Sequence, residues 1–388
     1  VHRIRHAYAL LEAGLGTRAH DEARAATRLA PDDAFAWKSL GWMLQHDAVG
    51  RRFGAGYDRA ASIAAYRKAS ELDPTNTDVT ADLSVLYEHD ANGTRYADQA
   101  GVELAVAEYR KRAKHLEDEK TDRYTDNLYY ALLHLRRFAE ARDGLRQLPT
   151  SSTRRALLLV ATAGADGSPA ALAAANEVIG GESDRRAALK SAGGVLTNLR
   201  EYSLAADLLE ASARGQPTTA AETQRIALLR KVNRGAREAI VVTDARSVVL
   251  KAYSLLISGE RRSDPWQPLT SRHSLQGEEA ERQFHTLRRM IQASLAQQEA
   301  PADVSADLMF ASLRVTVEGD DARGYRAQLR NAPAGTHYYV VREEGAYKLL
   351  ARGAQVGALA SVALERLDAG DTATARQWLD WARLEQDA

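Results

Sequence analysis

Seven residues between positions 34 and 74 have the spacing of two helices packed against each other. They are Trp37, Leu40, Gly41, Leu44, Tyr66, Ala69 and Pro74. Residues three or four apart share a helix face, so the first four predict a helix with an apolar face on which Gly41 admits a close neighbour. Tyr66 and Ala69 form the matching face of a second helix, which Pro74 ends because proline cannot continue a helix.

This stretch resembles the tetratricopeptide repeat family. The family pattern is W-x2-L-G-x2-Y, then A-x3-F, then P, on a period of about 34 residues, and here about nine further residues stand between the two helices. The resemblance implies a mainly α fold, a right-handed α-solenoid of helix hairpins. Each hairpin leaves an apolar face that stacked neighbours must bury, so several hairpins are needed.

The pattern continues on both sides of this pair. Terminating prolines and apolar faces place repeats at about 1–33, 34–74, 77–116, 122–149 and 186–217, with a degenerate pair at 151–185 and one further helix at 221–229 that continues the stack. Two insertions, 45–58 and 90–99, interrupt the second and third repeats. Their glycines and the Asn92-Gly93 turn signal predict loops, with a helical extension as the alternative for the first insertion.

The hydrophobic period changes near Thr243. An amphipathic helix is expected over 245–257, then a loop containing Trp266, then a helix over about 278–297. After Pro301 the period switches to two, which predicts half-buried strands. These strands are expected over 309–318, 325–329, 338–342 and 347–351, the last two forming a hairpin. Helices followed by an antiparallel meander indicate a small α+β domain near the C-terminus.

This order of elements, closed by the 338–350 hairpin, resembles the cone-shaped fold of the nuclear transport factor two-like superfamily over about 244–352. From Gly353 the helical period returns as a repeat-like helix pair. That pair either packs back on the sheet or belongs to repeats removed from the chain. The sequence therefore predicts an α-solenoid at 1–243, an α+β domain at 244–352 and a helix pair at 353–388.

Composition narrows the range of partners. Lys plus Arg and Asp plus Glu number 52 each, and this zero net charge argues against nucleic acid, because phosphate binding needs a basic surplus. The chain has no cysteine, which excludes disulfides, thiol nucleophiles and cysteine-based zinc sites. It has no apolar run of the roughly 18 residues that a membrane span needs. Because the chain starts at Val1, we expect a fragment or mature form of a longer protein. A solenoid with a cone-like module resembles an accessory region of a larger bacterial protein, and both cytoplasm and periplasm remain open as its compartment.

The repeat resemblance also implies which residues face a concave groove. In that family the first helix of each repeat lines the groove, with positions five, nine and thirteen among those that point inward. Residues of interest at these positions are Tyr8, Lys38, Trp42, His46, His89, Tyr130 and His134. Aromatic rings give contact area at low entropic cost and imidazoles give adaptable hydrogen bonds, which suits an extended peptide. The alternative is that these are ordinary half-exposed side chains, and that the histidines recur at equivalent repeat positions by chance.

The three histidines are also candidate metal ligands. Equivalent positions of successive repeats lie roughly 10 Å apart, as helix packing requires. Zinc needs its nitrogen ligands about 2 Å from a single ion. We therefore expect no metal at these histidines.

These features favour a non-enzymatic scaffold or adaptor that binds, in the groove, an extended segment of a protein partner or of its own longer chain. The alternative is a ligand-binding or catalytic α+β domain with a pocket around Trp266, His273 and His285. The chain shows no paired-carboxylate spacing, no HExxH and no G-x-S-x-G, so we expect no catalytic residue and no cofactor. A purely structural spacer is the third interpretation.

Overall fold

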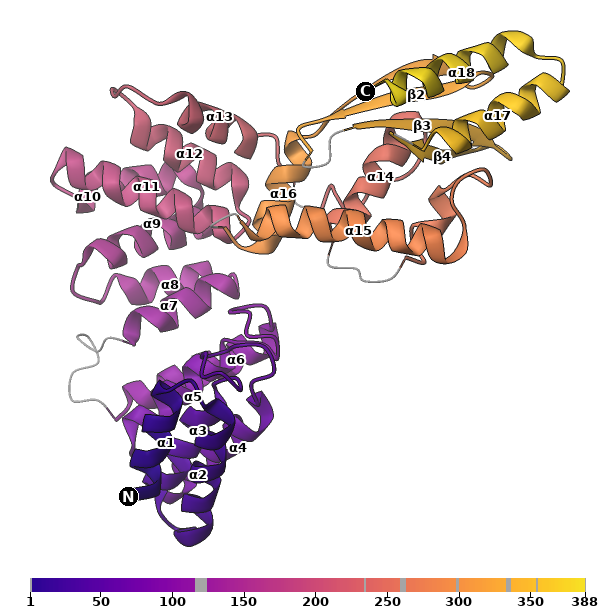
Figure 1. Ribbon diagram of the computed structural model, residues 1–388. Coiled ribbons are helices and arrows are strands. Elements are labelled where there is room, and N and C mark those ends of the chain that lie inside the picture. The colour runs from indigo at the N-terminus through magenta and orange to yellow at the C-terminus, as the bar shows by residue number, and fades with distance from the viewer. Residues whose placement is uncertain are drawn as a thin grey trace. The chain divides into compact units, whose positions relative to one another are not determined.

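A computed structural model describes residues 2–115, 124–233, 235–258, 263–297, 300–332, 336–353 and 355–387. The chain divides into two compact units, 1–215 and 216–388. The fold is mainly helical, with a small antiparallel sheet in the second unit (Figure 1). The expected start of the fourth repeat at Asp122 lies outside the described residues.

The first unit is a row of antiparallel helix hairpins (Figure 1). Its described helices are α1 (His2–Glu12), α2 (Gly16–Leu29), α3 (Ala34–Leu44), α4 (Arg59–Leu72), α5 (Thr77–Tyr87), α6 (Gln99–Ala113), α7 (Thr125–His134), α8 (Phe138–Leu145), α9 (Ser152–Asp166), α10 (Ser168–Val178), α11 (Glu182–Asn198) and α12 (Tyr202–Ala213). Successive helices pack as pairs, and each pair packs on the next. The predicted solenoid is thereby confirmed, and α9 and α10 form the degenerate pair.

In two hairpins, a glycine of one helix faces a large side chain of the other helix, and this contact brings the two helices close together. A Cβ atom at Gly41 would lie 2.7 Å from the Tyr66 ring, and the Gly41 carbonyl accepts a 2.7 Å hydrogen bond from Ser62 Oγ. A Cβ atom at Gly193 would likewise lie 2.6 Å from Leu209 Cγ. Both glycines stand where the repeat pattern predicts a close neighbour.

The second unit combines helices with a four-stranded meander of order β1-β2-β3-β4 in the described chain. Its elements are α13 (Ala220–Leu229), α14 (Ala245–Ile257), the short 3-10 helix η2 (Gln267–Leu269), α15 (Gly277–Ala296), α16 (Ala302–Ser312), β1 (Arg314–Asp320), β2 (Gly324–Arg330), β3 (Thr336–Glu343), β4 (Ala346–Arg352), α17 (Val356–Asp368) and α18 (Thr372–Gln386).

Helices cover both faces of this sheet. On one face α14 and α15 bury Tyr253 and Phe284 in a core that includes Tyr338. On the other face α17 and α18 bury Trp378 against Tyr339. Neighbouring residues of a strand point to opposite faces, so Tyr338 and Tyr339 join different cores. The C-terminal helix pair therefore packs back on the sheet, which was one of the two alternatives.

One expectation for this region is wrong. Residues 309–312 belong to helix α16 rather than to the first strand, which begins at Arg314. Pro301 lies at the N-terminal end of that helix, where proline is tolerated, and Val304 and Asp307 are buried at helical spacing. The helix expected at 221–229 is present as α13, which belongs to the second unit and packs there on α16.

Candidate peptide-binding site

Two inserted loops of the first unit are copies of one another. The first reads Gln-His-Asp-Ala-Val-Gly-Arg-Arg-Phe from Gln45, and the second reads Glu-His-Asp-Ala-Asn-Gly-Thr-Arg-Tyr from Glu88. Each follows the first helix of its hairpin, α3 or α5. The shared pattern is Gln/Glu-His-Asp-Ala-x-Gly-x-Arg-Phe/Tyr, and both copies form the same turn, bridge, arginine anchor and ring stack.

An aspartate and a glycine shape the turn of each loop. Asp47 Oδ1 accepts hydrogen bonds from the backbone N–H groups of Val49 (3.0 Å) and Arg51 (2.9 Å). Asp90 Oδ1 accepts the equivalent bonds from Asn92 (2.9 Å) and Thr94 (2.8 Å).

The glycine of each turn has a positive φ, +81° at Gly50 and +79° at Gly93, which costs a glycine little. The chain then returns to form an antiparallel bridge between His46 and Arg52, and between His89 and Arg95. The expectation of loops is therefore correct.

A buried polar side chain holds the arginine of each loop. Gln45 Oε1 accepts a 2.8 Å hydrogen bond from Arg52 Nε. Gln45 Nε2 donates a 3.0 Å hydrogen bond to the Tyr66 hydroxyl. Glu88 accepts from Arg95 Nε at 2.7 Å and from the Tyr109 hydroxyl at 2.7 Å. Both anchors are fully buried, whereas the arginines are exposed. Each guanidinium is thus fixed through Nε by its buried anchor, while the arginine residue itself is exposed.

Aromatic rings link each loop to the next repeat. Phe53 stacks on His89 with 3.7 Å between ring centroids, and Tyr96 stacks on His134 at 3.9 Å. The arginines lie over the same rings, with Arg52 Cζ 4.7 Å from the Phe53 centroid and Arg95 Cζ 4.7 Å from that of Tyr96. We call this row of rings and guanidinium groups the ring wall: Trp42, Arg52, Phe53, His89, Arg95, Tyr96 and His134.

The three predicted histidines are structural parts of this surface. His46 Nδ1 bonds to the Trp42 carbonyl at 2.9 Å and His89 Nδ1 to the Val85 carbonyl at 2.8 Å, so both nitrogens must carry a proton. Burial, opposed by that carbonyl bond and reinforced by Arg95 and Arg52, lowers the pKa of His89 to about 4. Burial also lowers the pKa of His134 to about 4, with a smaller contribution from Arg95. Near pH 7 these side chains are neutral.

The remaining predicted groove residues lie beside the ring wall or near its start. Trp42 is half-buried, 5.3 Å from the His46 ring, and 4.4 Å from Arg52 Cζ. Tyr130 is half-buried, and burial followed by the charge of Asp126 raises its pKa. Among the described residues, no ring contact joins Trp42 to Tyr8 or Tyr130.

Tyr8, Lys38 and Arg52 share one acidic neighbour, Asp82. Tyr8 is 37% exposed, and burial of the rest of it raises its pKa, with Asp82 adding to the rise. Lys38 forms a 3.1 Å ion pair with Asp78. Burial raises the pKa of Asp82, while the charges of Lys38 and Arg52 oppose that rise. Of these three residues, Lys38 therefore has a close ion-pair partner, whereas Asp82 acts on Arg52 only at longer range.

Residue-by-residue analysis of the sequence missed Gln45, Arg52 and Phe53 and their copies in the second loop. The signal that identifies them is the recurrence of the nine-residue pattern, which a search for repeats within the insertions would find. Family positions alone could not, because the insertions have no counterpart in the repeat pattern.

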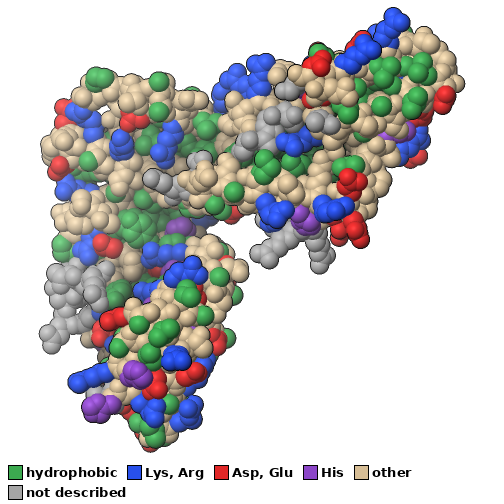
Figure 2. All heavy atoms as spheres, in the orientation of Figure 1, with side chains coloured by type: hydrophobic (Ala, Val, Ile, Leu, Met, Phe, Trp, Pro, Cys, Tyr) green, Lys and Arg blue, Asp and Glu red, His purple; other side chains and the backbone are tan. Residues whose placement is uncertain are grey.

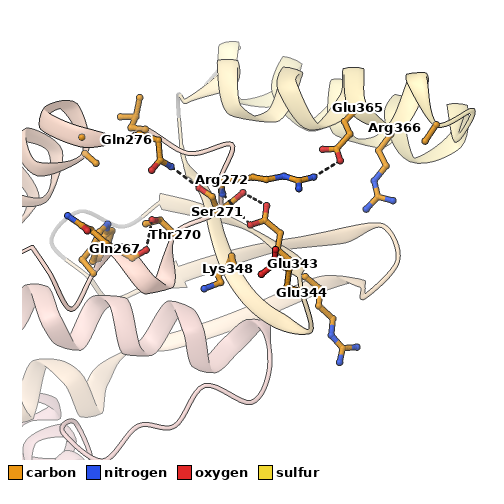
Figure 3. A pocket seen from close by; sticks show the side chains of 16 residues that line it. Gln267, Thr270, Ser271, Arg272, Gln276, Glu343, Glu344, Lys348, Glu365 and Arg366 are labelled. Atoms are coloured by element: carbon orange, nitrogen blue, oxygen red, sulfur yellow. Dashed lines mark hydrogen bonds and ion pairs between the residues drawn. The ribbon is translucent and has the colours of Figure 1, made fainter.

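The second unit has a cavity of about 730 Å³ of its own (Figure 3). It is lined by Trp266, Gln267, Thr270, Ser271, Arg272, Leu275, Gln276, Gly277, Ala280, Arg342, Glu343, Glu344, Lys348, Glu365, Arg366 and Ala369. Of the three predicted pocket residues, Trp266 lines it. His273 does not line it, although it lies 2.7 Å from the lining residue Glu365, and His285 contacts the Phe284 ring instead. The structure does not bring the two histidines together.

Some of the polar groups of this cavity are engaged with each other. Ser271 Oγ donates to Glu343 Oε1 at 2.5 Å, and Arg272 donates to Glu365 at 2.6 Å, as the dashed lines in Figure 3 show. The space between α14 and the sheet is filled by apolar side chains such as Tyr253 and Leu256. The cavity therefore lies at the edge of the sheet, and the interior of the domain is closed.

Positive and negative side chains are interspersed on the visible face of each unit (Figure 2). Among the described helices, none combines the length and the apolar character that a bilayer crossing requires.

Comparisons with solved structures give distant matches, of which two are the following. The tetratricopeptide repeat domain of P58(IPK) is 12% identical, with a TM-score of 0.30, over 98% of this chain and 91% of that one. Naa15/Naa10 bound to HypK-THB is 10% identical, with a TM-score of 0.37, over 99% of this chain and 63% of that one. No family model and no curated protein matches the chain. The assignment of a function therefore rests on the residues of the chain itself.

Proposed function

We propose that this chain is a non-enzymatic interaction scaffold, which binds an extended segment of a protein partner along the ring wall. The observation that carries the proposal is the pair of copied loops, which bring exposed guanidinium groups and half-buried rings into one row. Rings that are already fixed lose little entropy on binding, and aromatic and Arg side chains dominate the affinity of protein interfaces. The segment comes from another protein or from a longer form of this chain.

The predicted groove residues border the same surface. Trp42 lies against Arg52, and the charge of Arg95 acts on Tyr130. An extended chain that follows the ring wall would meet Trp42 near one end and Tyr130 near the other. We therefore propose these two side chains as its aromatic anchors, with Tyr8 and Lys38 at the margin.

The test uses peptides selected on the purified protein from a phage-displayed library of unstructured peptides. Their affinity is then measured by fluorescence anisotropy. We expect Trp42→Ala and Tyr130→Ala each to weaken binding about tenfold or more, because loss of an aromatic anchor costs more than about 1 kcal/mol. Leu104→Ala is the matched control, since Leu104 is 45% exposed on α6 and is not one of the ring-wall residues.

Trp42 also packs against the core of the first unit. The stability of each variant must therefore be measured by urea unfolding alongside its affinity, to separate lost binding from lost stability. Trp42→Phe keeps a ring at this position and is expected to restore most of the binding. Full affinity in both alanine variants would show that the peptides bind elsewhere.

A second candidate function is small-molecule binding by the cavity of the second unit. Its volume, about 730 Å³, is within the range of ligand sites, and Trp266 supplies an apolar wall. The element order of 244–352, which resembles the cone-shaped superfamily, agrees with such a role. Ligand-observed NMR with a fragment library tests it, and hits lost in Trp266→Ala and kept in Trp42→Ala would support it.

A further inference from the structure

The two loop copies differ at one buried residue, which is Gln45 in the first and Glu88 in the second. This residue decides whether the positive charge of the neighbouring arginine has a buried counter-charge. In the second loop Arg95 donates from two nitrogens to the carboxylate of Glu88, both at 2.7 Å. In the first loop Arg52 Nε donates to the neutral amide of Gln45 at 2.8 Å. Glu88 and Gln45 are fully buried in equivalent places. The charge of Arg95 is therefore matched by its anchor, whereas that of Arg52 is not.

Arg52 is also held in one orientation. Its guanidinium lies 4.4 Å from the Trp42 ring centroid and 4.7 Å from that of Phe53, so two rings flank it. Within the described residues, Arg52 makes no hydrogen bond or ion pair with a carboxylate. Asp82 attracts it at longer range, but Lys38 attracts Asp82 as well.

We propose that Arg52 is the binding site for a carboxylate side chain, Asp or Glu, on the extended partner segment. This inference rests on the proposed function and adds the chemistry of the partner to it. Because Nε faces Gln45, the two terminal nitrogens of Arg52 remain to meet the two oxygens of a carboxylate. Because two rings already hold the guanidinium in place, it loses little conformational entropy when it binds a carboxylate.

Exchange of the two anchors provides the test. Gln45→Glu and Glu88→Gln are isosteric, and each gives one loop the residue that the other already carries, so both variants are expected to fold. The probes are two fluorescent peptide pools, randomised except for a central Glu in one pool and a central Gln in the other. We expect the wild type to bind the Glu pool about tenfold more tightly.

Gln45→Glu should abolish that preference, because Arg52 then has a carboxylate of its own. Glu88→Gln should enlarge it, because Arg95 loses its counter-charge. Lack of preference in the wild type, or a preference that survives in Gln45→Glu, would overturn the inference. Displacement of both pools by equal low concentrations of inorganic phosphate would also overturn it, in favour of a phosphate site.

These results separate the two proposals. If both pools bind equally and Trp42→Ala weakens both, the scaffold function stands and the carboxylate site is wrong. If binding of both pools is indifferent to Trp42→Ala, Gln45→Glu and Glu88→Gln, the ring wall is not the binding surface and both proposals fail.

Discussion

Adjacent glycines on α11 show how much a single Cβ atom decides in this fold. A Cβ at Gly193 would lie 2.6 Å from Leu209 Cγ, whereas one at Gly194 would meet no atom within 4 Å. We expect Gly193→Ala to lower the free energy of unfolding of the first unit by about 1–3 kcal/mol, because the two helices must move apart. Gly194→Ala should raise it by up to about 1 kcal/mol, since alanine favours helix. Urea unfolding measures both, and a stabilising Gly193→Ala would refute the close packing.

The histidines of the ring wall give the first unit a dependence on pH. Burial lowers the pKa of His134 to about 4 in the folded chain. In the unfolded chain the same group titrates near about 6.5, so the unfolded state binds a proton first as the pH falls. The stability that neutral His134 contributes is therefore complete above about pH 6.5 and is lost towards pH 4.

We expect His134→Phe to reduce this loss, because phenylalanine keeps a ring against Tyr96 and takes up no proton. The measurement is the free energy of unfolding of wild type and variant, each at about pH 7 and about pH 4.5. The decrease in the free energy of unfolding from the higher pH to the lower should be about 1 kcal/mol smaller in the variant than in the wild type. The same fall in both proteins would contradict the assignment.

Helix α18 is a structural part of the second unit. Trp378 is fully buried against Tyr339, and a Cβ at Gly324 would lie 2.3 Å from its ring. We expect Trp378→Ala to cost about 3–5 kcal/mol of stability, as for other large buried side chains. Leu379→Ala, at the next position and 40% exposed, should change stability by less than about 1 kcal/mol. Thermal unfolding of both variants is the measurement. A loss of stability in Trp378→Ala as small as that in Leu379→Ala would mean that α18 does not pack on the sheet in this way.

Elements with a strong period and clear end signals were predictable from sequence. The α3–α4 hairpin has its Gly41–Tyr66 contact and a terminating Pro74, and the 338–351 hairpin has alternating residues around a Gly turn. Residues 309–312 were not predictable in this way, because a short apolar run fits helix and strand equally.

The candidate site was predictable only in part. Trp42, His89 and His134 follow from repeat positions, but what they contact depends on loops that the family pattern lacks. Phe53 reaches His89 because the turn around Gly50 sends the chain back past His46. That route depends on a backbone conformation with φ of +54° at Phe53, which local propensity does not predict.

On the scale of the whole molecule, the two compact units carry different surfaces. The first presents rings and guanidinium groups in a row, whereas the second presents a cavity lined by polar and charged groups, among them the Arg272–Glu365 ion pair. Zero net charge over the chain fits recognition by local contacts rather than by a long-range field. We therefore propose that the first unit is the part that binds the partner.

Hydrogen exchange of the full chain, with and without a saturating selected peptide, tests this assignment most directly. We predict slower amide exchange in segments 37–53, 85–96 and 126–134, and unchanged exchange elsewhere. Protection confined to 266–277 and 342–349, which border the cavity of the second unit, would contradict the account.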